Sequence, residues 1–255
     1  MVTISVMNQK GGVGKSTSTR NIATFLSMQG YKTLMVDIDA QANLSQISNI
    51  PDNVENTIVN VFQSKMPAIY NVSENLFIVP SSLAFAAIEN EIKDVENPHV
   101  FLFNFISAIK NDYDICLIDC PPAINIITLN ALATSQWVLI PMEASKLAFN
   151  GLELMLKVIN MIREGVNPDL SILGAFFNKF KEKTVVARDV LTQMKEKGID
   201  IALLDNRIRQ FEDFKKAEMI NQSIFEYAAG SLAAADYRKL GYEIIAKLKE
   251  NQSIK

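Results

Sequence analysis

A cluster of glycines and lysines near the start of the chain has the composition of a phosphate-binding loop. Residues 9–17 read QKGGVGKST and lie between a short apolar run and a segment of helical periodicity. Glycines let successive backbone N–H groups turn toward anionic oxygens, and the positive end of a following helix points to the same place. Lys15 could reach the β and γ phosphates of ATP, and the Ser16 hydroxyl could ligate Mg²⁺. The other predicted nucleotide contacts in this loop are Lys10, Gly11, Gly12, Val13, Gly14 and Thr17.

Two acidic segments follow predicted strands and complete a candidate catalytic site. Asp39 lies in residues 37–43, DIDAQAN, and could accept hydrogen bonds from a water beside a terminal phosphate. Asp119 ends the run YDICLID at residues 113–119 and precedes Cys-Pro-Pro. Ligands bind at the carboxyl ends of strands in open α/β sheets, so Asp119 is predicted to hold Mg²⁺ through water.

The elements needed to position these residues alternate along the chain. Short continuous apolar runs are interleaved with segments of helical period, which predicts one α/β domain over residues 1–255, with a mostly parallel twisted sheet covered by helices on both faces. Residues 43–75 are the least regular part. The predicted strands are Thr3–Met7, Thr33–Val36, Leu76–Val79, Ile115–Ile118, Trp137–Ile140 and Ser171–Phe177. The predicted helices are Ser16–Gln29, Leu83–Ile92, His99–Lys110, Ser145–Arg163, Val185–Lys197 and Leu232–Glu250.

Composition excludes several classes of protein. The 255 residues are 49% hydrophobic and 21% charged, an ordinary globular balance that excludes wholesale disorder. No window of about 18 apolar residues predicts a membrane-spanning helix, and no signal peptide is evident. The only cysteines, Cys116 and Cys120, cannot form a disulfide scaffold or a four-cysteine zinc site. We expect buried structural thiols in a cytoplasmic protein, in preference to a metal or redox pair.

The three motifs together resemble the ParA/MinD superfamily of deviant Walker ATPases. Gln9 replaces the first glycine of the strict phosphate-loop pattern, and the extra Lys10 is typical of this superfamily. The resemblance implies that Lys10 crosses to the partner's nucleotide in a face-to-face homodimer that sandwiches two ATP molecules. Residues 37–43 are similar to its D-x-D-P-Q-G-N segment, with alanines at the Pro and Gly positions, and residues 119–122 are similar to its D-x-P-P segment. The implied catalytic residues are Lys10, Lys15 and Asp39.

Within the superfamily, the chain is most similar to short ParA-type partition ATPases. Residues 140–153 resemble their post-strand segment and helix start, and residues 173–178 resemble their next strand and the loop near the base. Asn178 is therefore a candidate adenine contact, with a capping role as the open alternative. Cluster-ligating cysteines are missing, which disfavours the iron–sulfur carriers. The nine residues before Lys10 leave no room for a preceding DNA-binding domain. Residues 237–249 favour a packing helix over a MinD-type membrane helix.

The resemblance implies a function in plasmid or chromosome segregation. Such an ATPase binds DNA without sequence preference as an ATP dimer, acts on the nucleoid in the cytoplasm, and hydrolyses ATP weakly until a centromere-binding ParB-type partner stimulates it. No stable membrane association is expected. Two alternatives remain: a MinD-like ATPase that positions complexes on a membrane surface, and a ParA-like ATPase that positions a protein cargo.

Basic residues concentrate in the last third of the chain. Residues 1–178 carry 10 Lys/Arg against 16 Asp/Glu, whereas residues 179–255 carry 15 against 12. Non-specific DNA binding needs cations placed against phosphates, so this region supplies the candidates, although each could instead belong to a solvated helix face. The stretch 230–237 carries no arginine, where family members often do. The candidates are Lys179, Lys181, Lys183, Arg188, Arg207, Arg209, Lys215, Lys216, Arg238 and Lys239.

Overall fold

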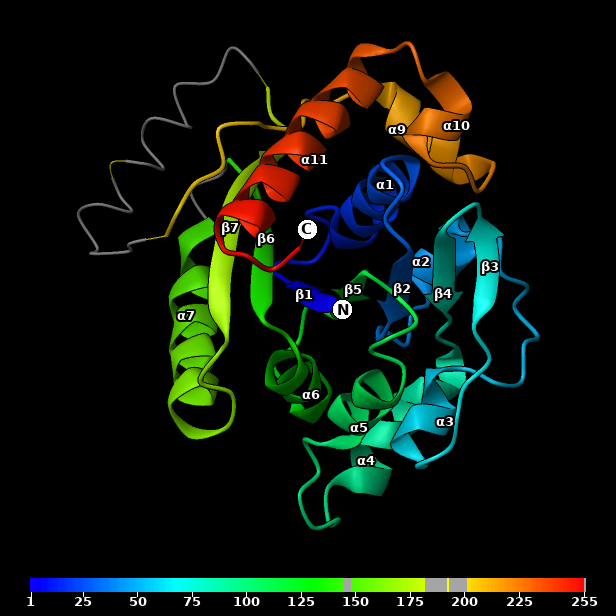
Figure 1. The fold of residues 1–255 in the computed structure, drawn as a ribbon, viewed down its shortest axis with the longest axis vertical. Coiled ribbons are helices and arrows are strands. Elements are labelled where there is room, and N and C mark those ends of the chain that lie inside the picture. Colours follow the sequence, from blue (N-terminus) through cyan, green and yellow to red (C-terminus); the bar gives the residue numbers. More distant parts are fainter. Residues whose placement is uncertain (145–147, 182–191, 193–200, 255) are drawn as a thin grey trace.

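One seven-stranded sheet forms the centre of the computed structural model, which describes residues 1–144, 148–181, 192 and 201–254 (Figure 1). The strand order is β3-β4-β2-β5-β1-β6-β7, and only the β3–β4 pair is antiparallel. Parallel strands that are buried on both faces explain why the apolar runs are continuous. The strands are β1 (Val2–Val6), β2 (Thr33–Asp37), β3 (Tyr70–Ser73), β4 (Leu76–Val79), β5 (Ile115–Asp119), β6 (Trp137–Glu143) and β7 (Ser171–Asn178).

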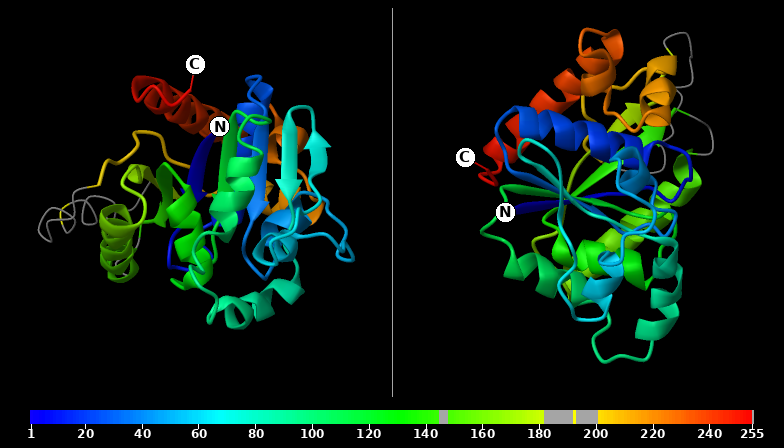
Figure 2. Two further views of the ribbon diagram at one scale, coloured as in Figure 1. Left: turned by 60° about the horizontal axis from the view of Figure 1, so that its bottom comes forward. Right: turned by 90° about the vertical axis from the view of Figure 1, so that its right-hand side faces the viewer.

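Helices cover both faces of this sheet and enclose two apolar cores (Figure 2). One face carries α1 (Lys15–Met28), α2 (Asn43–Ile47), α9 (Glu212–Met219), α10 (Ile224–Ala228) and α11 (Leu232–Glu250). The other carries α3 (Ile58–Phe62), η1 (Leu83–Ala87), α4 (Ile88–Ile92), α5 (Phe101–Ala108), α6 (Ile126–Thr134) and α7 (Ala148–Gly165). The predicted α/β fold with a mostly parallel sheet is confirmed.

The predicted elements correspond closely to the observed ones, with a few informative differences. The predicted helix Leu83–Ile92 begins as the 3₁₀ turn η1, and the region expected to be irregular contains α2, α3 and β3. The short elements α2, α3, β3, α6, α9 and α10 were not predicted as helices or strands. The predicted helix Val185–Lys197 lies outside the described residues, apart from residue 192.

Strand β6 continues through Pro141, where the sequence predicts its end. Pro141 is in register with Phe176 of β7, whereas the pairing of β6 with β1 ends at Leu139. The missing N–H of the proline therefore costs no hydrogen bond to β1, since that neighbour has already ended. The extension carries Glu143 to the same edge of the sheet as Asn178, with which it is in register.

Candidate active site

The phosphate-binding loop joins β1 to α1 and is held in place from the end of β7. Gly12 and Gly14 adopt left-handed φ angles of 75° and 84°. The Asn178 amide donates to the Val13 carbonyl at 2.8 Å. A Cβ at Gly14 would lie 2.4 Å from that amide nitrogen, so the close contact between loop and strand requires glycine there.

Lys15 is the first residue of α1 and is 8% exposed. Burial lowers the pKa of its ammonium group, and the charges of Asp119 and Asp39 oppose that shift. The two acids predicted to act with Lys15 are therefore near enough for their charges to affect its pKa. All three side chains come from the carboxyl-end edge of the sheet, where the sequence analysis places the site.

Two buried carboxylates lie side by side beneath the loop. Asp119 at the end of β5 is in register with Asp37 at the end of β2, and both are almost fully buried. Burial raises the pKa of Asp119, and the neighbouring Asp37 adds to the shift, whereas a hydrogen bond from Ser16 opposes it. The structure thus brings together Ser16 and Asp119, the two predicted magnesium ligands. A hydroxyl beside a carboxylate suits a hard cation that keeps several waters.

Asp37 holds the loop that carries Asp39. Its carboxylate accepts the Asp39 N–H at 3.1 Å and both the N–H and the hydroxyl of Ser45, at 2.9 and 2.7 Å. The Ser45 hydroxyl in turn accepts the Ser81 N–H at 2.9 Å. Burial raises the pKa of Asp37 to about 6, although these hydrogen bonds act in the opposite direction. Asp37 was given no role in the sequence-based predictions, although it directly follows the predicted strand Thr33–Val36 and is the first aspartate of the segment similar to D-x-D-P-Q-G-N.

The loop, the helix start and the Asp39 segment enclose a cleft of about 510 Å³. The Asp39 carboxylate accepts the Gln41 N–H at 2.9 Å and faces this cleft. Most of the predicted nucleotide contacts therefore share a single cavity. Its lining residues are Gly11, Gly12, Gly14, Lys15, Ser16, Thr17, Asp39, Gln41, Asn43, Ile47, Pro122, Lys179 and Glu218.

A second pocket of about 230 Å³ adjoins the cleft and is rich in aromatic rings. Asn178 lines it together with Phe211, Phe214 and Tyr237. Both polar ends of the Asn178 side chain already have partners in the protein, because its nitrogen donates to Val13 and its oxygen accepts the Lys179 N–H at 2.9 Å. This geometry favours the capping alternative for Asn178, which positions the loop, over a direct contact with adenine.

Lys10 directly precedes Gly11, which lines the cleft, but Lys10 is not itself among the lining residues. Its ammonium donates to Glu143 at 2.6 Å, and the two side chains are 37% and 27% exposed. The Lys10 N–H also donates to the Asn8 side chain at 2.9 Å, which fixes the loop backbone at this position.

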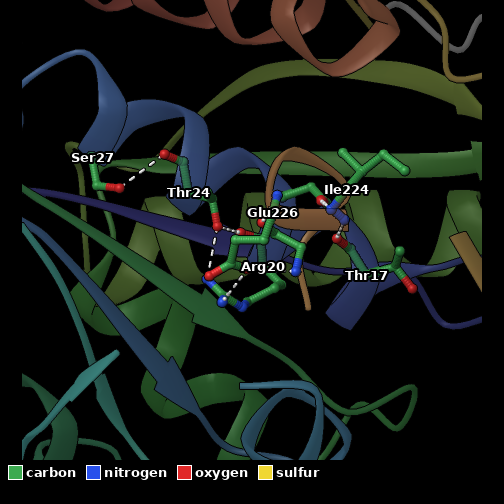
Figure 3. Close-up of polar contacts among 8 residues, drawn as sticks. Thr17, Arg20, Thr24, Ser27, Ile224 and Glu226 are labelled. Atoms are coloured by element: carbon green, nitrogen blue, oxygen red, sulfur yellow. Dashed lines mark hydrogen bonds and ion pairs between the residues drawn. The ribbon is translucent and has the colours of Figure 1, made fainter. Parts of the chain in front are cut away.

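A buried arginine anchors α1 to α10 (Figure 3). Arg20 is 2% exposed and donates to Glu226 at 3.0 Å and to Thr24 at 2.7 Å. Glu226 also accepts the Ser223 N–H at 2.6 Å as part of the capping box that begins α10. The Glu226 carboxylate therefore both neutralises the buried Arg20 charge and caps the N-terminus of α10.

The first turn of α1 carries two further links to the same region. The Thr17 hydroxyl donates to Glu218 of α9, and Asn21 accepts the Ile224 N–H at 2.7 Å at the start of α10. Asn21 also donates to the Thr17 carbonyl at 2.8 Å. The helix that presents the phosphate loop is thus connected through side chains to both α9 and α10.

The predicted DNA-binding residues occupy different environments. Lys179 lines the phosphate cleft, and Lys181 is exposed beside the end of β7. Arg209 donates twice to Asp236, at 2.7 and 3.0 Å, and contacts the Phe211 ring, which gives it a structural role. Arg207 stacks on Phe180 with 4.3 Å between the guanidinium carbon and the ring centroid. Lys183 and Arg188 lie outside the described residues.

The remaining basic candidates lie on two helices that touch. Lys215 and Lys216 are exposed on α9, and Lys239 is exposed on α11. Arg238 contacts the Phe225 ring at 5.6 Å. Phe214 of α9 and Tyr237 of α11 pack edge to face with 5.5 Å between ring centroids, so the lysines of the two helices are carried by elements in direct contact.

Helix α11 packs against the body of the protein. Leu240, Ile244 and Leu248 are fully buried, which confirms the predicted packing helix. Among the helices described, none is long and apolar enough to cross a bilayer. Cys116 and Cys120 are both buried and unpaired, and burial raises the pKa of each thiol, which confirms the expected structural thiols.

A glycine-rich loop between a parallel strand and a helix, with a buried lysine facing carboxylates at two strand ends, defines a P-loop nucleoside triphosphatase. The family profile described as "AAA domain" matches residues 1–172. The chromosome-partitioning ATPase Soj of Treponema pallidum is 32% identical over 96% of this chain and 97% of its own length. The chromosome partitioning protein ParA of Myxococcus xanthus is 29% identical over 96% of this chain and 88% of its own length. The chain therefore belongs to the ParA family of partition ATPases, within the ParA/MinD superfamily.

Solved structures agree with this placement. Cobyrinic acid a,c-diamide synthase from Mycobacterium smegmatis, with a bound ATP analogue and magnesium, superposes with a TM-score of 0.86 at 25% identity, covering 100% of this chain and 98% of that one. The septum site-determining protein MinD from Pyrococcus horikoshii, complexed with Mg-ADP, gives a TM-score of 0.77 at 25% identity, covering 97% and 98%.

Proposed function

We propose that this protein is an ATP-operated switch for DNA segregation. As an ATP-bound homodimer it binds DNA without sequence preference, and it returns to the monomer when ATP is hydrolysed. Hydrolysis is weak alone and is stimulated by a centromere-binding ParB-type partner. The protein acts in the cytoplasm, on the nucleoid. The observation that carries the proposal is that Lys15, Ser16 and Asp39 line one cleft, with the charge of Asp119 acting on Lys15, in a member of the ParA family.

ATP and Mg²⁺ are the cofactors, and the residues of the cleft fit both. The loop N–H groups and Lys15 suit the phosphates, and the Ser16 hydroxyl with Asp119 suits Mg²⁺. Among the described residues, no group of three or more acidic, histidine or cysteine side chains gathers around one point. Mg²⁺ relies on nucleotide phosphates and water for most of its ligands, so one hydroxyl and one carboxylate are sufficient on the protein side. In this assignment Asp39 positions the attacking water, since its carboxylate faces the cleft.

Lys10 supplies the proposed link between ATP and dimerisation. A γ-phosphate gathers negative charge during transfer, and a cation from the second subunit stabilises that charge. Lys10 is suited to this role because it is next to Gly11, which lines the cleft, and because its ion pair with Glu143 is partly exposed, so the long flexible side chain can leave that partner.

DNA contact is assigned to the exposed lysines of α9 and α11. Lys215 and Lys216 share α9 with Glu218, which lines the cleft and accepts from Thr17. A change in the nucleotide phosphates beside Thr17 can therefore be transmitted to α9 and its lysines through the Thr17–Glu218 hydrogen bond. We exclude Arg209 from this surface because its guanidinium is committed to Asp236.

The MinD-like alternative has less support. A membrane-surface role requires an exposed apolar helix face, and the apolar face of α11 is buried against the protein. Positioning of a protein cargo uses the same ATP and DNA chemistry, so it differs from segregation only in the partner that stimulates hydrolysis.

Sedimentation and DNA binding test the proposal together. We expect a monomer without nucleotide and a dimer with a non-hydrolysable ATP analogue, and DNA affinity should fall steeply between about 50 and 200 mM salt. Lys15→Ala should remove both responses. Asp39→Ala should form the dimer with ATP and fail to turn it over. A protein that binds vesicles but not DNA with ATP, or an Asp39→Ala variant that hydrolyses ATP normally, contradicts the proposal.

A further inference from the structure

Lys179 occupies a position that the predicted DNA-binding role does not explain. It follows the last residue of β7, and its ammonium donates to the Gly12 carbonyl within the phosphate-binding loop. It lines both the phosphate cleft and the adjoining aromatic pocket. The side chain therefore lies where the two pockets meet.

The backbone directs Lys179 toward the loop. Its φ of 52° is left-handed, a conformation that a lysine rarely adopts. The Asn178 side chain accepts the Lys179 N–H, and the next residue, Phe180, is fixed by hydrogen bonds with the backbone of Ile208 and Gln210 at 2.9 and 3.0 Å. A residue keeps such a backbone conformation only where the surrounding structure imposes it, and residues of this kind cluster at ligand sites.

The charges around Lys179 leave it available for an anion. Among the described residues, the carboxylate that pairs with Lys179 is Glu143, which lies 3.8 Å away and is already paired at 2.6 Å with Lys10. The closest acceptor of the Lys179 ammonium is thus a neutral carbonyl. A phosphate oxygen is a stronger acceptor for an ammonium group because the hydrogen bond is charge-assisted.

The negative charge in and around the cleft favours a second cation there. Its lining includes the carboxylates of Asp39 and Glu218, and Asp119 lies just beneath the loop. A nucleotide adds further negative charge to this cavity, and Lys15 is the one lysine of the loop buried within it. Lys179 reaches the same cavity from a different strand.

We propose that Lys179 binds the phosphates of the nucleotide held in its own subunit, and that it is not part of the DNA-binding surface. This inference requires only that the cleft binds nucleotide, and does not depend on the DNA-segregation function. It replaces the sequence-based expectation for Lys179 and adds a second strand, β7, to the phosphate site.

Titration with fluorescent ATP and ADP analogues tests the assignment. Lys179→Met keeps the aliphatic stem and removes the charge, and we expect it to weaken nucleotide binding by about tenfold. Lys179→Arg keeps the charge and should recover most of the affinity. Lys181→Ala is the matched control, since Lys181 is two residues away and exposed, and its nucleotide affinity should stay within about twofold of the original protein.

DNA binding measured at a saturating concentration of ATP analogue distinguishes a nucleotide-binding role of Lys179 from a DNA-binding role. Lys179→Met should then bind DNA within about twofold of the original protein, because its nucleotide site is filled. Unchanged nucleotide affinity in a Lys179→Met protein of native melting temperature overturns the inference, as does lost DNA affinity at full nucleotide occupancy. If Lys179→Met does not fold, Lys179→Gln provides the same comparison. If the unmodified protein binds no DNA, the segregation proposal fails and the nucleotide titration still decides the role of Lys179.

Discussion

Lys10 and Glu143 are joined within one chain by an ion pair of 2.6 Å, between the phosphate-binding loop and the extended end of β6. Both side chains are partly exposed, and ion pairs in that setting contribute at most about 1 kcal/mol. The pair therefore keeps Lys10 near the cleft without fixing it there. In the proposed dimer, the ammonium exchanges this carboxylate for the nucleotide of the partner.

Removing the carboxylate should help dimerisation slightly. We expect Glu143→Gln to tighten the ATP-dependent dimer by no more than about fivefold. An exposed ion pair contributes at most about 1 kcal/mol, and losing that energy changes an equilibrium constant by about this factor. Lys10→Ala should abolish the dimer while ATP still binds. Sedimentation equilibrium with a non-hydrolysable analogue measures both effects. Loss of the dimer in Glu143→Gln would mean that the carboxylate itself is needed at the interface.

The Arg20–Glu226 pair should respond unequally to the loss of either partner. Arg20 has a 3% exposed side chain, whereas that of Glu226 is 38% exposed. Glu226→Gln keeps the capping box but leaves a buried guanidinium without a countercharge, so it should lower the free energy of unfolding by about 2 kcal/mol. Arg20→Met leaves a carboxylate that water can reach and should cost less.

Urea unfolding without nucleotide measures this order of stability. Glu250→Gln, at the exposed end of α11, is the control for loss of a surface carboxylate and should be neutral. The reverse order, with Arg20→Met the less stable variant, would show that packing of the arginine stem matters more than its charge.

The site was largely predictable because its determinants are local. A glycine-rich segment after an apolar run and acidic residues at strand ends fix Lys15, Ser16, Asp39 and Asp119 near one sheet edge, whatever the details of packing. Helix α11 was equally clear, since its apolar residues recur with helical spacing over 19 residues.

The unpredicted features depend on contacts between distant segments. Helix α6 buries Thr128 and Asn130 as well as its apolar residues, so it lacks the polar face that identifies an amphipathic helix. Strand β3 is a short edge strand that exists through its pairing with β4. The commitment of Arg209 to Asp236, 27 residues later, likewise has no signature in the local pattern.

Asp37 should make the stability of the protein depend on pH. Its pKa is raised from 3.8 to about 6 by burial, so between these values the folded state binds more protons than the unfolded chain. The stability of the protein relative to Asp37→Asn should therefore decrease as pH rises from about 4 to about 6, and change little above that. Chemical denaturation without Mg²⁺ or nucleotide measures this difference. A difference that grows with pH would mean that the hydrogen bonds to Asp37 outweigh its burial.

Gly241 of α11 lies directly against the Phe25 ring of α1. A Cβ at this position would lie 2.1 Å from the Phe25 ring, which also packs edge to face on Tyr242 with 4.9 Å between ring centroids. Alanine gains about 1 kcal/mol over glycine inside a helix, but overpacking a core typically costs about 1–3 kcal/mol. We expect Gly241→Ala to be destabilising in urea unfolding despite its better helix propensity. Gly165→Ala, at the end of α7 where nothing lies within 4 Å, is the control and should be neutral or stabilising. Equal effects in the two variants would mean that α11 shifts away from α1 at little cost.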